Sequence, residues 1–544
     1  MDRIDTLIRG ARVMDGTGNP WKYGDVLISG DSILDIAAPG SVPGENAANV
    51  IDASGKIVCP GFIDIQSHSI APLMRDGRCV SKITQGVTTE IMGEGWTPAP
   101  AGGRFTDPMS GRLLADGDVG KWAEVAPGWT RFRHWLEAME ETGVSPNVGS
   151  YLAGGSLRRY GKGMDPGPAD QDELDTMRRV MAEAMEDGAF GITYALIYPP
   201  DSFVGTDEIV EICKVVAHYN GTYITHMRSE DEHILDGLAE AMEIGDRSGA
   251  SVEIYHLKAT GQASWHLMPE VIERITDARA RGLDITADMY PYTASGTGFS
   301  AIIPTWVAEG GQFFENLEKP EVRERLHREM TDPNSDYRGR ARSAGIENIT
   351  PVGFRLPEHQ EYVGRRLNEI AEMRNEHWVD AVINLLVAER QGIATIYYMM
   401  NEDNLRMQVQ QPWVKISSDA GGVDPSWAEP EGPLHPRGYG TFPRVLQKYV
   451  REEGLLTWEE AIRKMTSSVA DRLSIKDRGV LRPGMMADVV VFDPETVTDN
   501  ATFEQPHQLS SGIEHVFVNG TPVVTDGQHT GSTPGRFVKG PGAS

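Results

Sequence analysis

Two short apolar runs in the middle of the chain each carry a histidine near their carboxyl end. The first run, 222–228, contains His226, and the second, 252–258, contains His256, thirty residues later. Both runs are rich in β-branched and aromatic residues, as strands are, and the segment between them, 234–248, has a helical pattern. A strand–helix–strand unit requires the two strands to be parallel. We therefore expect His226 and His256 at equivalent ends of neighbouring strands, close enough to bind one ion.

A histidine at a strand end has two interpretations. A single one is more often a core residue that is hydrogen-bonded to the backbone. The matched pair favours a metal site, because imidazole is the commonest protein ligand for a metal ion at neutral pH. In a barrel built of such units, the carboxyl ends of the strands carry the chemistry.

The size and charge of the chain exclude several classes of protein. Its 544 residues are too many for one ordinary domain, and 40% of them are apolar, so a substantial core can form. The formal net charge of −28 argues against nucleic acid or an anionic membrane as a partner. The oligomeric state stays open, a homo-oligomer included.

The cysteines and the apolar runs bear on location. Cys59, Cys79 and Cys213 are odd in number and form no CxxC motif, so a disulfide framework is not expected and a reducing cytoplasm is predicted. The first residues contain no apolar signal core, and no uninterrupted apolar run approaches ~20 residues. The sequence therefore predicts neither a signal peptide nor a membrane span.

Three regions of the chain differ in pattern. Short alternating strands with tight turns recur in 1–58 and in 481–544, which predicts a small β-sandwich built from both ends of the chain. Between them, 59–480 alternates strands with helical stretches, which predicts an α/β fold and, within it, a (β/α)8 TIM barrel. Residues of about 305–390 are charged and mostly helical, too long for a single connection, and are predicted to form a subdomain inserted at the barrel mouth, a candidate lid. The strands predicted for the core, besides the two histidine runs, are 62–65, 88–92, 147–151, 191–194, 283–288, 394–398 and 414–419.

Glu94 is a third candidate ligand. It follows a predicted strand and lies between Gly93 and Gly95, which let the backbone approach closely and leave one carboxylate between them. A solvated turn is the alternative. Together, Glu94, His226 and His256 make a two-histidine, one-carboxylate set, a known catalytic zinc composition that leaves a fourth position for water.

Two further polar residues stand at strand ends. Asp419 ends the last predicted core strand, where aspartate is an unfavourable strand residue, and is a candidate general base; a turn or helix cap is the competing interpretation. His68 lies two residues after Gln66, so both point to one face of a strand. Since glutamine is a poor ligand for a transition metal, His68 is either a ligand or a donor behind the ligands.

Three residues are candidates for binding substrate. Lys258 lies two residues after His256 on the same face, and Arg437 lies in a glycine-rich segment. Arginine matches a carboxylate through two hydrogen bonds, and lysine adds a point charge. Tyr290 supplies a hydroxyl. For each of them, packing or solvation is the alternative.

The chain resembles the amidohydrolase superfamily, specifically the N-acyl-D-amino-acid deacylase (D-aminoacylase) family, nearly from end to end. The resemblance rests on the motifs PGFIDIQSH (60–68), ITQGVTTEIMGEG (83–95), GAFGITYALIYPP (188–200), THMRSE (225–230), EIYHLKATG (253–261), DITADMYPYTA (284–294), SSDAGG (417–422), HPRGYGTFPRVL (435–446) and DRGVLRPGMMADVVVFDP (477–494). It implies a zinc-dependent hydrolase of the amide bond of N-acyl-D-amino acids, on a (β/α)8 barrel with a β-sandwich and an inserted subdomain.

The resemblance also implies roles for single residues. His226 and His256 match the ligands of the tightly held zinc, and Glu94 lies near the place of a ligand that is cysteine or glutamate in the family. Asp419 matches the catalytic acid/base. The residues that match the grip on the substrate carboxylate are Lys258, Tyr290 and Arg437.

The chain departs from the family pattern at a few positions. Gln66 replaces the first histidine of the usual His-x-His, so we expect one zinc per chain, with a second site that is weak or empty. Leu257 stands where many members have a second histidine, and the order Ser295–Gly296 is inverted, which bears on side-chain specificity. Two alternatives stay open: an enzyme that hydrolyses another amide, a cyclic amide or a carbamate at the same site, and a member of the superfamily without catalytic activity.

Overall fold

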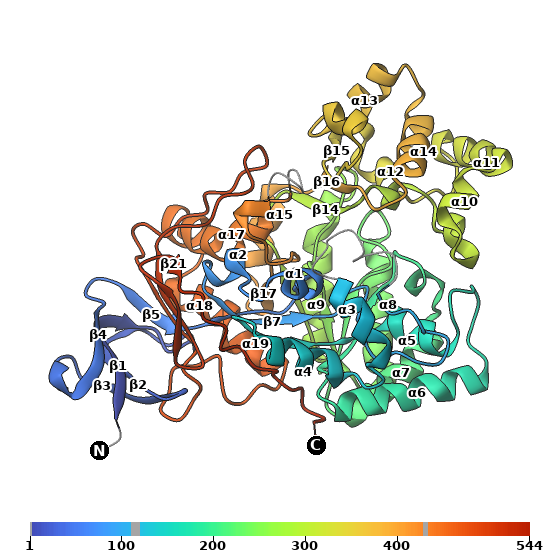
Figure 1. The fold of residues 1–544 in the computed structure, drawn as a ribbon. Helices are drawn as coiled ribbons and strands as arrows, with labels where there is room; N and C mark the ends of the chain where they lie inside the picture. The colour runs from blue at the N-terminus through green and yellow to red at the C-terminus, as the bar shows by residue number, and fades with distance from the viewer. Residues whose placement is uncertain (1–2, 110–119, 428–433, 544) are drawn as a thin grey trace.

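Parallel strands in the middle of the chain form the scaffold of the molecule (Figure 1). The computed structural model describes residues 3–109, 120–427 and 434–543. In this part of the chain, one sheet has the strand order β6-β7-β8 and a second has the order β17-β13-β12-β11-β10-β9, with parallel neighbours throughout. Their bounds are β6 Phe62–Asp64, β7 Val87–Met92, β8 Asn147–Ser150, β9 Leu152–Ala153, β10 Gly191–Ala195, β11 Thr222–His226, β12 Ser251–Ile254, β13 Ile285–Met289 and β17 Val414–Ile416.

Helices connect these strands and cover them. The strands β10, β11 and β13 are buried along their whole length, as expected where helices cover a parallel sheet. The connecting helices are α6 Gln171–Glu186, α7 Thr206–His218, α8 Ile234–Ser248 and α9 Met268–Ala280. The chain therefore has an α/β fold, as the sequence predicts.

The strand–helix–strand unit around the two histidines is confirmed. Helix α8 spans the predicted segment and ends at Gly249, whose φ of 77° suits a left-handed helix cap. It buries an apolar stripe that includes Leu238 and Ile244. Strands β11 and β12 pair in parallel, so His226 at the end of β11 and His256 just beyond β12 face the same edge.

Strands from both ends of the chain form one nine-stranded sheet, in the order β21-β20-β19-β18-β5-β1-β2-β3, with β4 beside β1. The N-terminal and C-terminal strands meet where β18 runs antiparallel to β5, with Val489 opposite Pro60. Figure 1 shows the blue and red strands side by side, away from the insertion. The bounds are β1 Ile4–Val13, β2 Lys22–Ser29, β3 Ser32–Ala37, β4 Ala47–Asp52, β5 Ile57–Pro60, β18 Val489–Phe492, β19 Ile513–Val518, β20 Thr521–Thr525 and β21 Gln528–His529.

A helical lobe stands beside the parallel-stranded core, at the upper right of Figure 1. It contains α10 Phe313–Leu317, α11 Pro320–Thr331, α12 Arg340–Ala344, α13 Leu367–Arg374 and α14 Trp378–Glu389. It also contains an antiparallel sheet in the order β14-β16-β15, formed by Ala294–Gly298, Ala394–Tyr398 and Ile349–Pro351. An apolar core of its own, with Leu326, Ile370 and Leu386, holds the lobe together.

One strand prediction is wrong. Residues 394–398 were expected in the parallel core, but β16 pairs antiparallel with β14 and β15 in the inserted lobe. An apolar run of five residues indicates a strand, but its pattern does not say which sheet it joins, because the partners lie up to about a hundred residues away.

The other α-helices of the described residues are α1 Ile70–Arg75, α2 Val80–Ile83, α3 Gly120–Val125, α4 Arg133–Thr142, α5 Gly154–Gly161, α15 Glu402–Val409, α17 Arg437–Arg444, α18 Trp458–Met465 and α19 Ser467–Arg472. Within the described ranges, none of the helices combines the length and the apolar character needed to cross a membrane.

Candidate metal centre and active site

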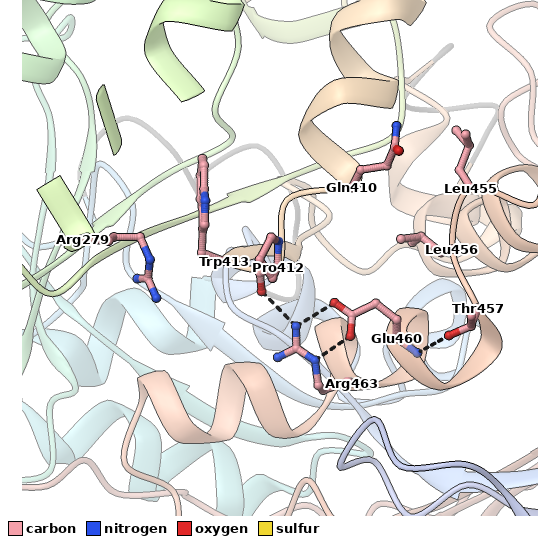
Figure 2. Close-up of a pocket in the computed structure, with 9 residues that line it drawn as sticks. All are labelled: Arg279, Gln410, Pro412, Trp413, Leu455, Leu456, Thr457, Glu460 and Arg463. Atoms are coloured by element: carbon pink, nitrogen blue, oxygen red, sulfur yellow. Dashed lines mark hydrogen bonds and ion pairs between the residues drawn. The ribbon is translucent and has the colours of Figure 1, made fainter. Parts of the chain in front are cut away.

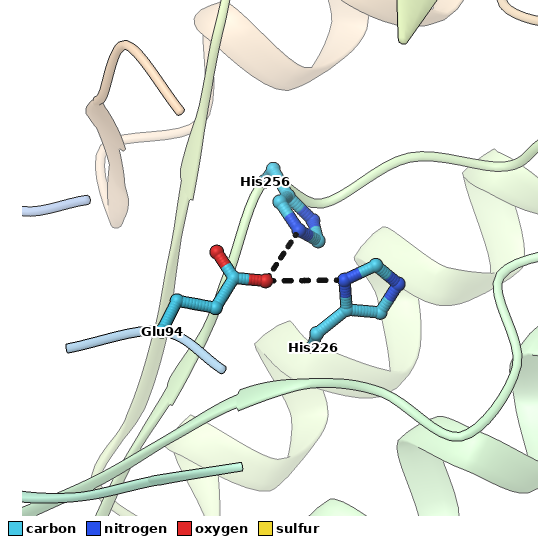
Figure 3. A group of neighbouring side chains, drawn as sticks. All are labelled: Glu94, His226 and His256. Atoms are coloured by element: carbon cyan, nitrogen blue, oxygen red, sulfur yellow. Dashed lines mark hydrogen bonds and ion pairs between the residues drawn. The ribbon is translucent and has the colours of Figure 1, made fainter. Parts of the chain in front are cut away.

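Glu94, His226 and His256 meet at the carboxyl edge of the parallel strands (Figure 3). Glu94 Oε1 lies 3.2 Å from His226 Nδ1 and 3.5 Å from His256 Nε2. One ligand atom from each residue lies within 4.8 Å of the others. The side chains are 7%, 5% and 2% exposed, respectively, so water screens their charges little. The structure thus brings the predicted trio together.

The backbone at these positions is constrained. Gly93, with a φ of 124°, precedes Glu94, and a Cβ there would lie 2.5 Å from the carbonyl oxygen of Tyr151, so the close approach requires glycine. His256 has a φ of 34° and donates its backbone N–H to Asp288 Oδ1 at 2.9 Å. Left-handed backbone at a non-glycine residue is costly and is found preferentially at functional sites.

Glu230 lies behind both histidines, and no sequence motif indicated a role for it. Its Oε2 is 3.2 Å from His226 Nε2, and its Oε1 is 3.1 Å from His256 Nδ1. A metal-ligating histidine characteristically donates its other ring N–H to such a carboxylate, which leaves the first nitrogen's lone pair for the metal. The ring nitrogens that face Glu94 are then the ones free to bind a metal. This donor set fits zinc.

Asp419 and His68 adjoin the trio. His68 Nε2 lies 2.9 Å from Asp419 Oδ1 and 3.3 Å from Glu94 Oε2. Asp419 has a φ of 49° and accepts a 2.6 Å hydrogen bond from Arg437 Nη1. Burial alone would raise the pKa of Asp419, but the Arg437 guanidinium and His256 outweigh it and lower that pKa to about 2. Asp419 is therefore a carboxylate at neutral pH, as a general base must be.

Gln66 occupies the side of Glu94 that faces Asp419. Its amide Nε2 donates to Glu94 Oε2 at 2.5 Å, and its Oε1 accepts from Ser417 Oγ at 3.3 Å. The amide therefore holds the second carboxylate oxygen of Glu94.

Arg437 and Tyr290 adjoin each other beside Asp419. The guanidinium carbon of Arg437 lies 4.7 Å from the centre of the Tyr290 ring, and Arg437 Nη2 donates to Gly296 O at 2.9 Å. Among the described residues, Arg437 Nε, Tyr290 Oη and Ser295 Oγ are buried and have no hydrogen-bond partner. Buried donors normally have partners, so these three groups have hydrogen-bonding capacity that the described residues do not use.

Lys258 is engaged elsewhere. Its ammonium donates to Glu230 Oε1 at 2.6 Å and to the backbone oxygen of His256 at 3.2 Å, and it lies 2.7 Å from His256 Nδ1. The ammonium thus neutralises Glu230 behind the histidines. Its part in binding substrate stays a prediction.

The inserted lobe reaches the site through Arg340 at the start of α12. Arg340 Nη2 donates to Glu230 Oε2 at 3.0 Å and lies 3.4 Å from His226 Nε2. Local sequence pattern carries no signal for this contact, because Arg340 and Glu230 are 110 residues apart.

Other hollows and clusters carry less chemistry. A hollow of about 730 Å³ (Figure 2) lies at the amino end of β17, opposite Asp419, and its Arg463 pairs with Glu460 at 2.7 Å. On the lobe, His327, His377 and Asp380 are grouped. There, His377 Nδ1 accepts the backbone N–H of Val379 at the start of α14, so its other nitrogen carries the proton in the neutral ring and is no ligand.

Comparisons with known proteins place the chain. Residues 419–524 match the model of the amidohydrolase family. The chain is 34% identical to a D-aminoacylase of Alcaligenes xylosoxydans xylosoxydans over 98% of its own length and 97% of that protein. The chain belongs to the amidohydrolase family, in its D-aminoacylase group.

Other members are similar to nearly the same degree. An N-acyl-D-aspartate deacylase of the same organism is 33% identical over 99% of this chain and 96% of that protein. The crystal structure of an N-acyl-D-glutamate deacylase from Bordetella bronchiseptica, complexed with zinc and a phosphonate mimic of the tetrahedral intermediate, superposes with a TM-score of 0.80 at 27% identity, covering 99% of this chain and 100% of that one. Sequence identity alone therefore does not show which amino-acid side chain the substrate carries.

Proposed function

We propose that this enzyme hydrolyses the amide bond of N-acyl-D-amino acids, giving a carboxylate and a free D-amino acid, with zinc held by Glu94, His226 and His256. The observation that carries the proposal is that trio, with Glu230 placed to accept the second ring N–H of His226 and lying 3.1 Å from His256 Nδ1. When bound, zinc supplies Lewis acidity, which polarises the scissile carbonyl and acidifies the attacking water.

Asp419 moves the proton. As a carboxylate beside the trio, it takes a proton from the attacking water and returns it to the departing amine. His68 holds Oδ1 of Asp419 and Arg437 holds Oδ2, so both oxygens are fixed in direction. This orientation supports the assignment of Asp419 as the catalytic acid/base.

Arg437 and Tyr290 bind the α-carboxylate of the substrate. Their unmatched buried donors, Arg437 Nε and Tyr290 Oη, support this role. Lys258 adds positive charge from behind His256. With the carboxylate held on this side of Asp419, the amine nitrogen stands within reach of the proton that Asp419 returns.

We propose one zinc per chain. His68, Glu94 and Asp419 also lie close enough together to be ligands of a second ion, but the Gln66 amide donates to Glu94 Oε2, the oxygen that faces His68. Two metals would require Gln66 to give up this hydrogen bond. A second position is therefore weak or empty.

We also propose the finer architecture. An isolated parallel bridge between Ser67 and Ala420 supports closure of the two parallel sheets into a (β/α)8 barrel. The domains are then a barrel of 59–480, with an insertion at about 305–390, and a β-sandwich of 1–58 and 481–544. Three free, buried cysteines support a cytoplasmic enzyme, without nucleic acid or membrane as partner.

The test is a metal analysis of protein purified without chelator, joined to assays of N-acetyl-D-amino acids and their L-enantiomers on the same sample. About one zinc per chain with D-selective release of amine is expected. Zinc without any release from substrates with a free α-carboxylate would refute the deacylase and favour another amide, a cyclic amide or a carbamate. Neither zinc nor activity after zinc is restored would favour the non-catalytic relative.

A further inference from the structure

A buried ion cluster adjoins the segment that carries Asp419. Lys82, on α2, donates to Asp64 Oδ2 at 2.5 Å and to Ser418 Oγ at 2.6 Å. Its ammonium also lies 3.3 Å from Glu90 Oε1, and the side chains of all three charged residues are 0% exposed. Buried charges are costly unless they are paired and hydrogen-bonded, so this cluster needs a reason beyond the packing of a core. The position of Ser418, directly before Asp419, supplies one.

Asp64 joins two backbone segments at this place. Its Oδ1 accepts the backbone N–H of Ser418 at 3.0 Å and that of Gln66 at 3.3 Å, and its Oδ2 also accepts from the Ser418 hydroxyl. The Asp419 N–H in turn donates to Gln66 O at 3.0 Å. The carboxylate that Lys82 binds therefore links the end of β6 to the segment that leads into Asp419.

Glu90 does the same for the segment that carries His68. Glu90 Oε2 accepts from Ser67 Oγ at 2.6 Å, and Ser67 forms an isolated parallel bridge with Ala420. The His68 N–H donates to Ala420 O at 3.2 Å. Within the described ranges, Glu90 Oε1 has no hydrogen bond, and neither carboxylate of the cluster has an ion pair with a residue other than Lys82. The Lys82 ammonium is therefore the cation that compensates both carboxylates.

The backbone of Asp419 needs this support. Its φ of 49° lies in the left-handed region, which is costly for a residue other than glycine and persists only where the surroundings fix it. His68 and Arg437 hold the side chain of Asp419. The cluster instead holds the preceding residue, through both the N–H and the hydroxyl of Ser418. The direction of the Asp419 carboxylate thus depends on the cluster as well as on its own hydrogen bonds.

We propose, on the basis of the proposed function, that Lys82 is a positioning residue for the catalytic acid/base. Its ammonium holds Asp64 and Ser418, and through them it keeps the Asp419 carboxylate in line with the attacking water and the departing amine. A displacement of ~1 Å from the productive geometry can cost about 100-fold in rate. In the part of the chain that the structure describes, Lys82 has no hydrogen bond or ion pair with the zinc-binding trio. Its role therefore concerns proton transfer and not the binding of zinc.

The test is Lys82→Met, made in the wild type and in Asp419→Asn and assayed with zinc-loaded enzyme on N-acetyl derivatives of D-leucine, D-methionine, D-aspartate and D-glutamate. In the wild type we expect kcat to fall by about 10–100-fold, with KM and zinc content unchanged. In Asp419→Asn we expect no further fall, because the base that Lys82 positions is already lost.

The two backgrounds separate positioning from a merely structural role. A structural role would lower kcat equally in both, and that result would overturn the proposal while the deacylase activity stands. An unchanged kcat in folded Lys82→Met would overturn it as well. If the wild type hydrolyses none of the four compounds, the proposed function is overturned and this inference with it.

Lys415→Met is the matched control for the lysine. Lys415 is also buried, 2% exposed, and paired with a buried carboxylate, that of Glu253, in the amino half of the strands. Its replacement leaves a buried carboxylate just as Lys82→Met does, but kcat per folded molecule should stay that of the wild type. Thermal unfolding of both variants checks that they fold. An equal fall of kcat in the two variants would contradict a role specific to Lys82.

Ser418→Ala keeps the proposal testable if Lys82→Met does not fold. It removes only the hydroxyl that binds Lys82 and leaves every charge in place, so kcat should fall by roughly three- to tenfold, the usual worth of one hydrogen bond. Ser145→Ala is its control, because Ser145 is buried and its hydroxyl donates to Ser532 O at 2.7 Å, away from the site; kcat should not change. An unchanged kcat in Ser418→Ala would overturn the proposal.

Discussion

The two ends of the parallel strands both bury charged groups, but they differ in how these groups are arranged. At the amino half, Glu253 of β12 binds Lys415 Nζ at 3.0 Å and Arg472 Nε at 3.2 Å, and Thr286 donates to it as well. At the carboxyl end of the same sheet, two histidines converge on Glu94, and Arg437 Nε has no partner among the described residues.

The difference shows what marks a functional site. Burial lowers the pKa of Lys415 to about 8, although Glu253 opposes this shift. A perturbed pKa is therefore found in the amino half of the strands too. Structural ion pairs perturb pKa values as active sites do. The carboxyl end is distinguished by histidine and carboxylate ligand atoms that converge on one point.

The largest expected effect is on catalysis, from a substitution at the carboxyl end of the strands. Asp419→Asn keeps the shape of the side chain but cannot take a proton, so kcat should fall by about 10²–10⁴, the usual contribution of general acid–base catalysis. Metal analysis of the variant is the control, since zinc content should not change. A variant with full zinc and full kcat would remove Asp419 from the mechanism.

A substitution in the amino half of the strands should change stability and leave catalysis unchanged. Lys415→Met leaves Glu253 without one of its two buried cations, which should lower the free energy of unfolding by about 3–5 kcal/mol. Denaturant unfolding measures this change, and kcat per folded molecule should match that of the wild type. Lys214→Met, which breaks an exposed pair with Glu211, is the control and should cost under about 1 kcal/mol. Equal losses in the two variants would contradict the comparison.

Glu230 lies at the carboxyl end of the strands, behind the two histidines. Glu230→Gln weakens the acceptor for the His226 N–H and removes the charge beside His256, so zinc affinity should fall by about 10–100-fold. Competition with a chelator of known affinity measures the change, and circular dichroism checks the fold. Unchanged zinc affinity would mean that Glu230 serves Lys258 and Arg340 and not the metal.

The smallest expected effect is the pH dependence of Lys415. Its folded pKa of about 8 lies below the unfolded value of ~10.4, so the unfolded chain binds more protons in this window. The stability of the wild type relative to Lys415→Met should therefore rise by ~1.5 kcal/mol from pH 8 to pH 9.5. Unfolding curves of both proteins at the two pH values test this sign. A falling difference would show that Lys415 stays charged in its pair.

The local sequence pattern was sufficient to predict that the residues at the centre of the site lie together. Strand, helix and strand around His226 and His256 follow from β-branched runs and a helical period, and parallel pairing then places both histidines at one edge. Glu94 follows from the two glycines that flank it. These signals are local in sequence, and each is tied to a backbone geometry.

The contacts that the sequence did not indicate are distant in the chain. Arg340 reaches Glu230 from the inserted lobe, and β16 joins a sheet of that lobe, because tertiary packing and not local period decides both. Lys258 was expected to face substrate from its spacing to His256. The structure engages it with Glu230, a carboxylate whose place four residues after His226 gave no sign of such a role.

The sheet that joins both ends of the chain also sets an order of events during biosynthesis. Strand β5 ends at Pro60, and its neighbour β18 begins at Val489. At a translation rate of ~5–20 residues per second, the first strands wait roughly 20–90 s for that partner. Until then β5 has an open edge, a form in which strands pair with other chains. A nascent chain halted before residue 489 therefore exposes this edge to pairing with other chains.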